Sequence, residues 1–168
     1  MLKFGIQNGL NVARLGLTED QILTACSLAD KTGYHSIWYM DHSNVPQWSN
    51  AIVNDPWVML AGIAAVTNNV ELGTCVTDAL RRHPSNIALA SITLDRLSKG
   101  RGTLGIGAGE AQNLKEFNIP FDKPVSKFEE QLQVIKHLYD SDPDNRNCLL
   151  YTSPSPRDVE ESRMPSCA

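Results

Sequence analysis

Short apolar runs alternate with longer segments of helical character along the first 140 residues of the chain. Four of these runs have the length and the aliphatic or β-branched content of buried strands. They span residues 2–6, 36–40, 70–76 and 101–106. A helical segment follows each run, so the pattern predicts a strand and a helix repeated four times.

The starts of these helices carry specific signals. The segment 18–21, Thr-Glu-Asp-Gln, is a capping box, in which each of two side chains accepts a hydrogen bond from the other residue's backbone N–H. Asp55 precedes Pro56, and proline favours the first helical position. Pro84 predicts the start of the third helix, and a second capping box at 126–129 predicts the start of the fourth.

Polar residues gather where the predicted strands end. They are Gln7 and Asn8, Asp41 and His42, Thr77 and Asp78, and Glu110. Alternating strands and helices form a parallel sheet, in which the carboxyl ends of the strands meet at the functional edge. We expect the side chains of Asp41, His42 and Glu110 to converge there. Four such units are consistent with half of an eightfold barrel.

The segment from Gly100 to Asn113 contains Gly105, Gly107 and Gly109, followed directly by Glu110. A glycine backbone can turn sharply and approach another molecule closely, because it carries no Cβ. One interpretation is a bare surface for a flat cofactor beside a carboxylate, and the alternative is a glycine-rich turn with a solvated glutamate. The segment is neither a phosphate loop nor a dinucleotide fingerprint, because it lacks the Gly-Lys-Ser/Thr of the first and the third glycine of the second.

Composition narrows the class of protein. A chain of 168 residues with 42% hydrophobic content predicts one globular domain. The net charge of −4 gives no basic surface for nucleic acid or membrane, and no apolar run has the length of a membrane span. The four cysteines have neither metal spacing nor a disulfide framework, so we expect a cytoplasmic protein without a metal.

Five segments together resemble the bacterial luciferase-like superfamily, and most closely its branch that uses the deazaflavin coenzyme F420. They are Met40-Asp41-His42 and the segments 72–78, 81–84, 93–101 and 105–111. The branch includes methylene-tetrahydromethanopterin reductases, alcohol and sugar-phosphate dehydrogenases and ketoreductases. The resemblance implies the N-terminal half of a (β/α)₈ TIM barrel, with the ring system of the cofactor across the C-terminal ends of the strands.

The resemblance also implies roles for individual residues. His42 corresponds to the active-site histidine that takes the hydroxyl proton in alcohol- and sugar-oxidising members. Glu110 corresponds to a carboxylate that manages the proton at the reduced ring nitrogen, and Trp48 is the candidate for substrate contact. The implied cofactor-binding residues are Asp41, Cys75, Val76, Gly107, Ala108, Gly109 and Asn113, with a non-prolyl cis peptide between Cys75 and Val76.

These roles suit the chemistry of hydride transfer, which leaves protons to be placed. An imidazole changes charge near neutrality, and a carboxylate near a ring nitrogen can share a proton. Taken alone, His42 is better explained as a loop histidine bonded to backbone, but its place beside Asp41 and facing Glu110 favours the catalytic interpretation. For Arg81 and Arg82 we expect a solvated turn, with contact to an anionic substrate or cofactor tail as the alternative.

The strand–helix pattern breaks after Tyr139. A fifth strand begins near Cys148, but the prolines that follow cannot continue a central strand. The segment from Cys148 resembles translated sequencing-adapter DNA, so we expect a partial barrel domain over residues 1–147 and a non-native or disordered tail over 148–168. The fragment is expected to be inactive.

The function hypothesis is an oxidoreductase that transfers hydride between coenzyme F420 and an alcohol, carbonyl or pterin-type substrate. One alternative is an FMN-dependent luciferase-like monooxygenase. Another, of a different class, is a non-catalytic flavin-binding protein. The expected partners are a small-molecule substrate and, in the intact form, a second copy of the protein.

Overall fold

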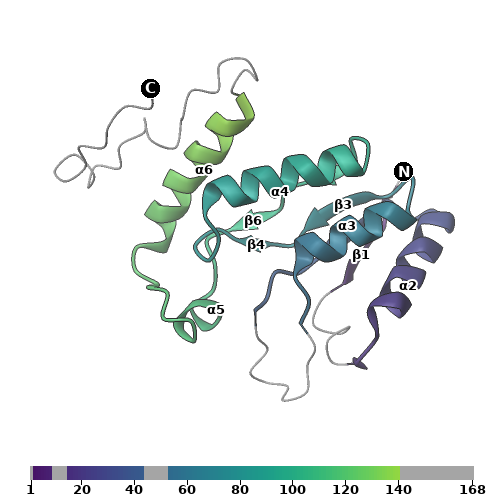
Figure 1. Ribbon diagram of the computed structural model, residues 1–168, viewed down its shortest axis with the longest axis horizontal. Coiled ribbons are helices and arrows are strands. Elements are labelled where there is room, and N and C mark those ends of the chain that lie inside the picture. The colour runs from purple at the N-terminus through teal and green to yellow at the C-terminus, as the bar shows by residue number, and fades with distance from the viewer. Residues whose placement is uncertain (1, 9–14, 44–52, 141–168) are drawn as a thin grey trace, which may run out of the picture.

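The structure, a computed structural model, describes residues 2–8, 15–43 and 53–140 (Figure 1). Four strands form a parallel sheet in the order β1-β2-β3-β5. They are β1 (Gly5–Asn8), β2 (Ser36–Tyr39), β3 (Glu71–Thr74) and β5 (Gly102–Thr103). A second pair of parallel strands, β4 (Thr77–Asp78) and β6 (Ile106–Gly107), follows β3 and β5 along the chain.

Helices alternate with these strands, which confirms the predicted parallel α/β fold (Figure 1). They are α2 (Glu19–Lys31), α3 (Pro56–Val66), α4 (Pro84–Leu97), α5 (Ala111–Lys115) and α6 (Pro124–Asp140). Helix α3 packs between α2 and α4, and α4 packs in turn against α6. Within the described residues, no helix has the length and apolarity that crossing a membrane requires.

The helix-start signals succeed in three of four places. Gln21 N donates to Thr18 Oγ1 at 3.3 Å and Thr18 N donates to Gln21 Oε1 at 2.9 Å, so the first capping box is formed. Asp55 caps α3 and Pro84 begins α4, as predicted. The capping box at 126–129 is wrong, because α6 begins earlier, at Pro124. A proline suits a first helical turn, since its fixed φ is helical and its missing N–H would have no partner there.

Two strand boundaries also differ from the prediction. The first strand is Gly5–Asn8 and not residues 2–6, so Gln7 and Asn8 pair within the sheet instead of following it. Thr77 and Asp78 form β4 and pair with β6, whereas the sequence placed them after a strand. The pairs Gln7-Asn8 and Thr77-Asp78 are short and polar. Their conformation is therefore decided by the strands they pair with, which a local sequence pattern does not show.

The break between β3 and β4 has a side-chain cause. The Thr74 hydroxyl donates to Gly105 O at 2.6 Å and accepts from Gly105 N at 3.2 Å. A side chain thus takes the place of the backbone ladder at this point. The ladder resumes where Thr77 N donates to the same Gly105 carbonyl at 2.8 Å.

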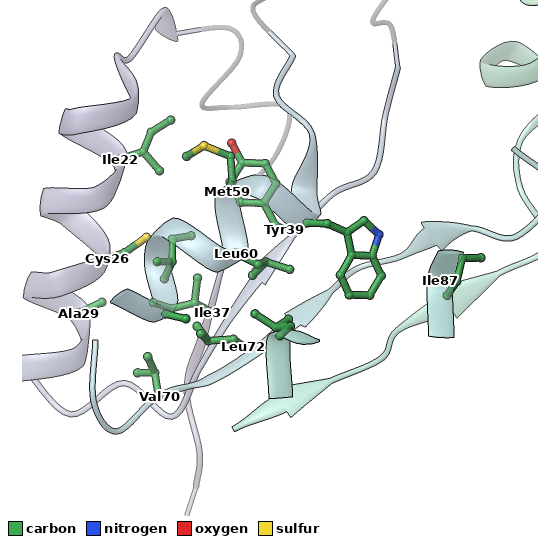
Figure 2. Close-up of a cluster of buried hydrophobic side chains, with 14 of the residues drawn as sticks. Ile22, Cys26, Ala29, Ile37, Tyr39, Met59, Leu60, Val70, Leu72 and Ile87 are labelled. Carbon is green, nitrogen blue, oxygen red and sulfur yellow. The ribbon is translucent and has the colours of Figure 1, made fainter. Parts of the chain in front are cut away.

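A hydrophobic core lies between the helices and the sheet (Figure 2). Figure 2 shows Ile22, Cys26 and Ala29 on one side of α2, facing side chains of the sheet and α3. Fully buried members include Ile37 of β2, Leu60 of α3 and Leu72 of β3. This core fixes the strands, whose carboxyl ends carry the candidate site.

Candidate functional site

The predicted catalytic side chains come from two loops at the carboxyl ends of the strands. His42 lies in the segment that follows β2, and Glu110 precedes the first residue of α5, shortly after β6. Asn113 of α5 contacts both. Its Nδ2 lies 3.3 Å from His42 Nδ1 and 3.4 Å from Glu110 Oε2. The structure therefore brings together His42 and Glu110, which are far apart in sequence, through one amide group.

Asn113 is held firmly in this position. It is 3% exposed, and its backbone carbonyl accepts a hydrogen bond from the Ser43 hydroxyl at 3.3 Å. Within the described residues, its side-chain Oδ1 is buried and has no hydrogen-bond partner. Buried polar atoms are nearly always paired in folded proteins, so this oxygen is suited to a donor on a bound molecule.

Asp41 lies at the centre of a buried ion-pair cluster. Its Oδ1 contacts Arg81 Nη2, its Oδ2 accepts from Arg82 Nε at 2.9 Å, and Thr77 Oγ1 donates to the same Oδ2. Arg82 also donates to Asp55 Oδ2 at 2.6 Å. The side chain of Asp41 is 0% exposed, so its carboxylate is fully occupied by groups of this chain.

The solvated turn expected at Arg81 and Arg82 is wrong. The two side chains are 17% and 24% exposed and pair with Asp41. A buried carboxylate requires compensating donors, and the arginines supply them at the edge of the sheet. The one sequence signal for this contact was the position of these residues after neighbouring parallel strands.

The ionisation of the cluster follows from its contacts. Burial alone would raise the pKa of Asp41, but hydrogen bonds from Arg82 and Thr77, together with the charges of both arginines, lower it overall. Burial acts to lower the pKa of Arg82, whereas hydrogen bonds to Asp41 and Asp55 raise it overall. Asp41 and Arg82 therefore stay ionised at neutral pH.

The peptide bond between Cys75 and Val76 is cis and non-prolyl, as the resemblance implied. It lies between β3 and β4, beside the break in the ladder. The Val76 side chain is 49% exposed, while the Cys75 sulfur accepts a hydrogen bond from Gln7 Nε2 at 3.7 Å. Val76 thus leaves an apolar surface open at this edge of the sheet.

The glycine-rich turn packs closely against the neighbouring strand. A Cβ at Gly107 would lie 2.8 Å from Val76 Cγ2, and one at Gly109 would lie 2.4 Å from Asp78 Oδ1. Gly109 also has φ +78°, which favours glycine. The sequence predicted that these glycines approach another molecule closely. In the structure, Gly107 and Gly109 also approach Val76 and Asp78 of the same chain closely. Ala108 lies between these two glycines at the same edge.

Sequence analysis missed the contribution of Asp78. Its Oδ1 accepts from the backbone N–H groups of Leu80 at 2.9 Å and Arg81 at 3.2 Å, which fixes the turn before α4. An aspartate that bonds the backbone two residues ahead is a recognised turn signal, and it could have been found.

Trp48, the predicted domain boundary at residue 147 and the tail lie outside the described residues.

Comparison with known proteins relates this chain to one family. A sequence model of luciferase-like monooxygenases matches residues 7–158. The chain is 34% identical over 160 residues to the phthiodiolone/phenolphthiodiolone dimycocerosates ketoreductase of Mycobacterium bovis, a match that covers 83% of this chain and 41% of that protein. It is 36% identical over 115 residues to the F420-dependent glucose-6-phosphate dehydrogenase of Kineococcus radiotolerans, covering 66% of this chain and 34% of that protein.

A solved structure agrees with these matches. The F420-dependent secondary alcohol dehydrogenase in complex with an F420–acetone adduct superposes with a TM-score of 0.74 and 25% sequence identity. The superposition covers 83% of this chain and 42% of that chain. The chain thus spans less than half the length of the relatives it matches.

Proposed function

The chain belongs to the luciferase-like monooxygenase family, and we propose that the protein containing it transfers hydride between coenzyme F420 and an alcohol or carbonyl carbon. The observation that carries this proposal is the joining of His42 and Glu110 through Asn113 at the carboxyl ends of parallel strands. The names of two relatives, an F420-dependent glucose-6-phosphate dehydrogenase and an F420-dependent secondary alcohol dehydrogenase, favour the deazaflavin.

The residues present fit a flat, partly polar ring system. Asn113 offers a buried oxygen that has no partner within the described residues, which suits an N–H donor of a ring. Val76 offers a half-exposed apolar side chain, and the backbone of Gly107 to Gly109 lies beside it. These groups would hold the ring, while the enclosed carboxylate of Asp41 would act by fixing Arg81 and Arg82.

A bound deazaflavin supplies the site that accepts or gives the hydride. The protein supplies the proton handling. His42 would exchange a proton with a substrate oxygen, since an imidazole works as acid or base near neutrality. Glu110, whose Oε2 accepts from Gln112 Nε2 at 2.7 Å, would share the proton of the reduced ring nitrogen.

Cofactor choice is tested by binding. We expect coenzyme F420 to bind at least about tenfold more tightly than FMN, a difference of about 1.4 kcal/mol, to the protein with the full length of its relatives. Fluorescence titration with each cofactor measures this. Tighter binding of FMN would favour the alternative, an FMN-dependent monooxygenase of the same family.

The role of His42 is tested by a split between turnover and binding. His42→Ala should lower kcat by about 10²–10⁴-fold, because general acid–base catalysis contributes that much, and leave the Kd for F420 within about threefold. His35→Ala is the matched control, since His35 precedes β2 at the opposite, amino end of the strands and its ring pairs with Glu71 at 3.3 Å. Unchanged kcat in His42→Ala would show that His42 is structural.

We expect no turnover from the 168 residues alone. The match covers 41% of the ketoreductase relative, so more than half the length of such a protein lies outside the match. A non-catalytic flavin-binding role would instead give cofactor binding without turnover in the longer protein as well.

A further inference from the structure

The orientation of the Asn113 amide is determined by Glu110. Glu110 Oε2 lies 3.4 Å from Asn113 Nδ2 and 2.7 Å from Gln112 Nε2. An ionised carboxylate only accepts hydrogen bonds, so the atom of Asn113 nearest to it is the amino group and not the oxygen. The reverse orientation would place two acceptors against each other.

This orientation in turn determines the protonation of the His42 ring. The same amino group lies 3.3 Å from His42 Nδ1 and can only donate to it. Nδ1 must therefore carry the lone pair, and in the neutral ring the proton must lie on Nε2. Which ring nitrogen carries the proton is commonly determined by the hydrogen bond that the other one makes.

We infer that Asn113 is a positioning residue that connects Glu110 to His42 and holds His42 as the Nε2–H tautomer. In this state the second ring nitrogen of His42 is a hydrogen-bond donor and not a base. The inference rests on the proposed function and bears on the direction of the proposed reaction. In this tautomer the Nε2–H of His42 can donate a hydrogen bond to a carbonyl oxygen.

Accepting a hydroxyl proton at Nε2 requires the opposite tautomer, with the ring proton on Nδ1. Nδ1–H needs an acceptor in place of the amino group, so the Asn113 amide would have to turn over and present Oδ1 to His42. That movement would take the amino group away from Glu110, which would keep its hydrogen bond from Gln112. Asn113 thus links the role of His42 to the contacts of Glu110.

The tautomer is measurable in the chain itself, without cofactor. Long-range ¹H–¹⁵N spectra of the uniformly labelled 168-residue chain at pH 8 distinguish a ring nitrogen with a lone pair from one with a proton. We expect the lone pair of His42 on Nδ1. In Asn113→Asp, a carboxylate of the same shape accepts where the amino group donated, and the proton should move to Nδ1. In Asn113→Ala, a mixture of both tautomers is expected.

Several controls accompany this measurement. His42→Gln assigns the signals of His42 by their loss. Asn118→Asp adds the same charge at an exposed position after α5 and should leave the tautomer unchanged. The signals of His83 report whether each variant is folded. A wild-type His42 with its proton on Nδ1, or a tautomer that does not change in folded Asn113→Asp, would overturn the inference. Because no cofactor is used, this outcome is independent of whether F420 binds.

Discussion

Asp41 shows how a single buried charge can organise the edge of a sheet. Its carboxylate, with 0% side-chain exposure, joins the end of β2 to the turn that carries Arg81 and Arg82. Asp55 balances the second guanidinium from the start of α3. Two carboxylates and two guanidinium groups thus neutralise one another where three elements meet. Removing one partner of a buried pair costs more than the pair contributes, because the remaining charge stays buried.

Asp41→Asn should therefore destabilise the protein strongly. We expect the free energy of unfolding to fall by about 3–5 kcal/mol, measured by urea denaturation at pH 7. Asp55→Asn is the matched control, because Asn also caps a helix and the Asp55 side chain is 40% exposed. Its loss should stay below about 1 kcal/mol, as for exposed ion pairs. Equal losses in the two variants would contradict the buried-cluster argument.

The same variant gives a pH dependence of known sign. The pKa of Asp41 is lowered in the folded protein. Its contribution to stability is therefore complete above the unfolded carboxyl value of about 3.9 and is lost as the pH falls through the folded pKa. The difference in unfolding free energy between wild type and Asp41→Asn should be constant above about pH 5 and shrink below it, most steeply below about pH 4. A difference that grows on acidification would contradict this assignment.

At the level of single residues, the sequence predicted which residues belong to the candidate site better than which residues contact one another. The positions of His42 and Glu110 after parallel strands were sufficient to expect that they converge. Their shared contact, Asn113, lies on α5, a five-residue helix that the sequence did not predict. The burial of Arg81 and Arg82 was not predicted either, because their position after a strand indicates only the edge of the sheet and an arginine pair in a turn is ordinarily solvated.

At the level of elements, local signals were accurate where a helix starts and weak where a strand ends. The capping box at Thr18 depends on neighbouring residues alone, and it formed. The ladder between β3 and β5 stops where the Thr74 hydroxyl bonds both backbone groups of Gly105, residues 31 positions apart. No local pattern contains that contact, so each predicted strand appeared continuous.

Two glycine-to-alanine changes should have opposite effects on stability, because Gly105 lies in close contact with the backbone of β3 and Gly62 does not. A Cβ at Gly105 would lie 1.9 Å from Thr74 O, a backbone atom that cannot move without shifting β3. We expect Gly105→Ala to lower the free energy of unfolding by about 2–3 kcal/mol or more, since overpacking against fixed groups costs about 1–3 kcal/mol.

Gly62→Ala is the control for that change. Gly62 lies inside α3, and its Cβ would make an ordinary contact of 3.4 Å with Leu23 Cδ2. Alanine in a helix interior is more favourable than glycine by about 0.5–1 kcal/mol. Thermal or urea unfolding of both variants should therefore give shifts of opposite sign. A stabilised Gly105→Ala would show that β3 and β5 are not held as closely as the structure has them.

At the level of the whole molecule, a second set of stabilising contacts lies at the end of the sheet opposite to the candidate chemistry. Arg101, just before β5, donates to the carbonyl groups of Val70 at 2.7 Å and Thr67 at 3.0 Å. Asp30, at the end of α2, accepts from the backbone N–H groups of Asn69 at 2.7 Å and Val70 at 2.8 Å. These contacts fix the amino ends of the strands. The carboxyl ends carry His42, Glu110 and Asn113 beside the Asp41 cluster, and candidate chemistry at this end is typical of parallel α/β folds.

The sheet also has two open edges within the described part of the chain. β1 pairs only with β2 there, and β5 only with β3. Leu2 and Phe4, just before β1, are 76% and 63% exposed. An unpaired strand edge beside exposed apolar side chains favours pairing with another chain.

We therefore expect the 168-residue chain to self-associate through its β1 edge. Burying about 400 Å² of apolar surface is worth about 10 kcal/mol, which association entropy of about 4–15 kcal/mol largely offsets. The association should then be weak and concentration-dependent in sedimentation velocity between about 5 and 500 μM, because the difference leaves less than the roughly 8 kcal/mol that a micromolar Kd requires. Phe4→Lys should shift the protein toward monomer, because a charged lysine disfavours edge pairing. Leu89→Lys is the control, as Leu89 is 65% exposed on α4, a helix that packs against β5 at the other edge of the sheet. A wild-type chain that stays monomeric at the highest concentration, or a Leu89→Lys variant that dissociates as Phe4→Lys does, would show that the β1 edge is not the contact.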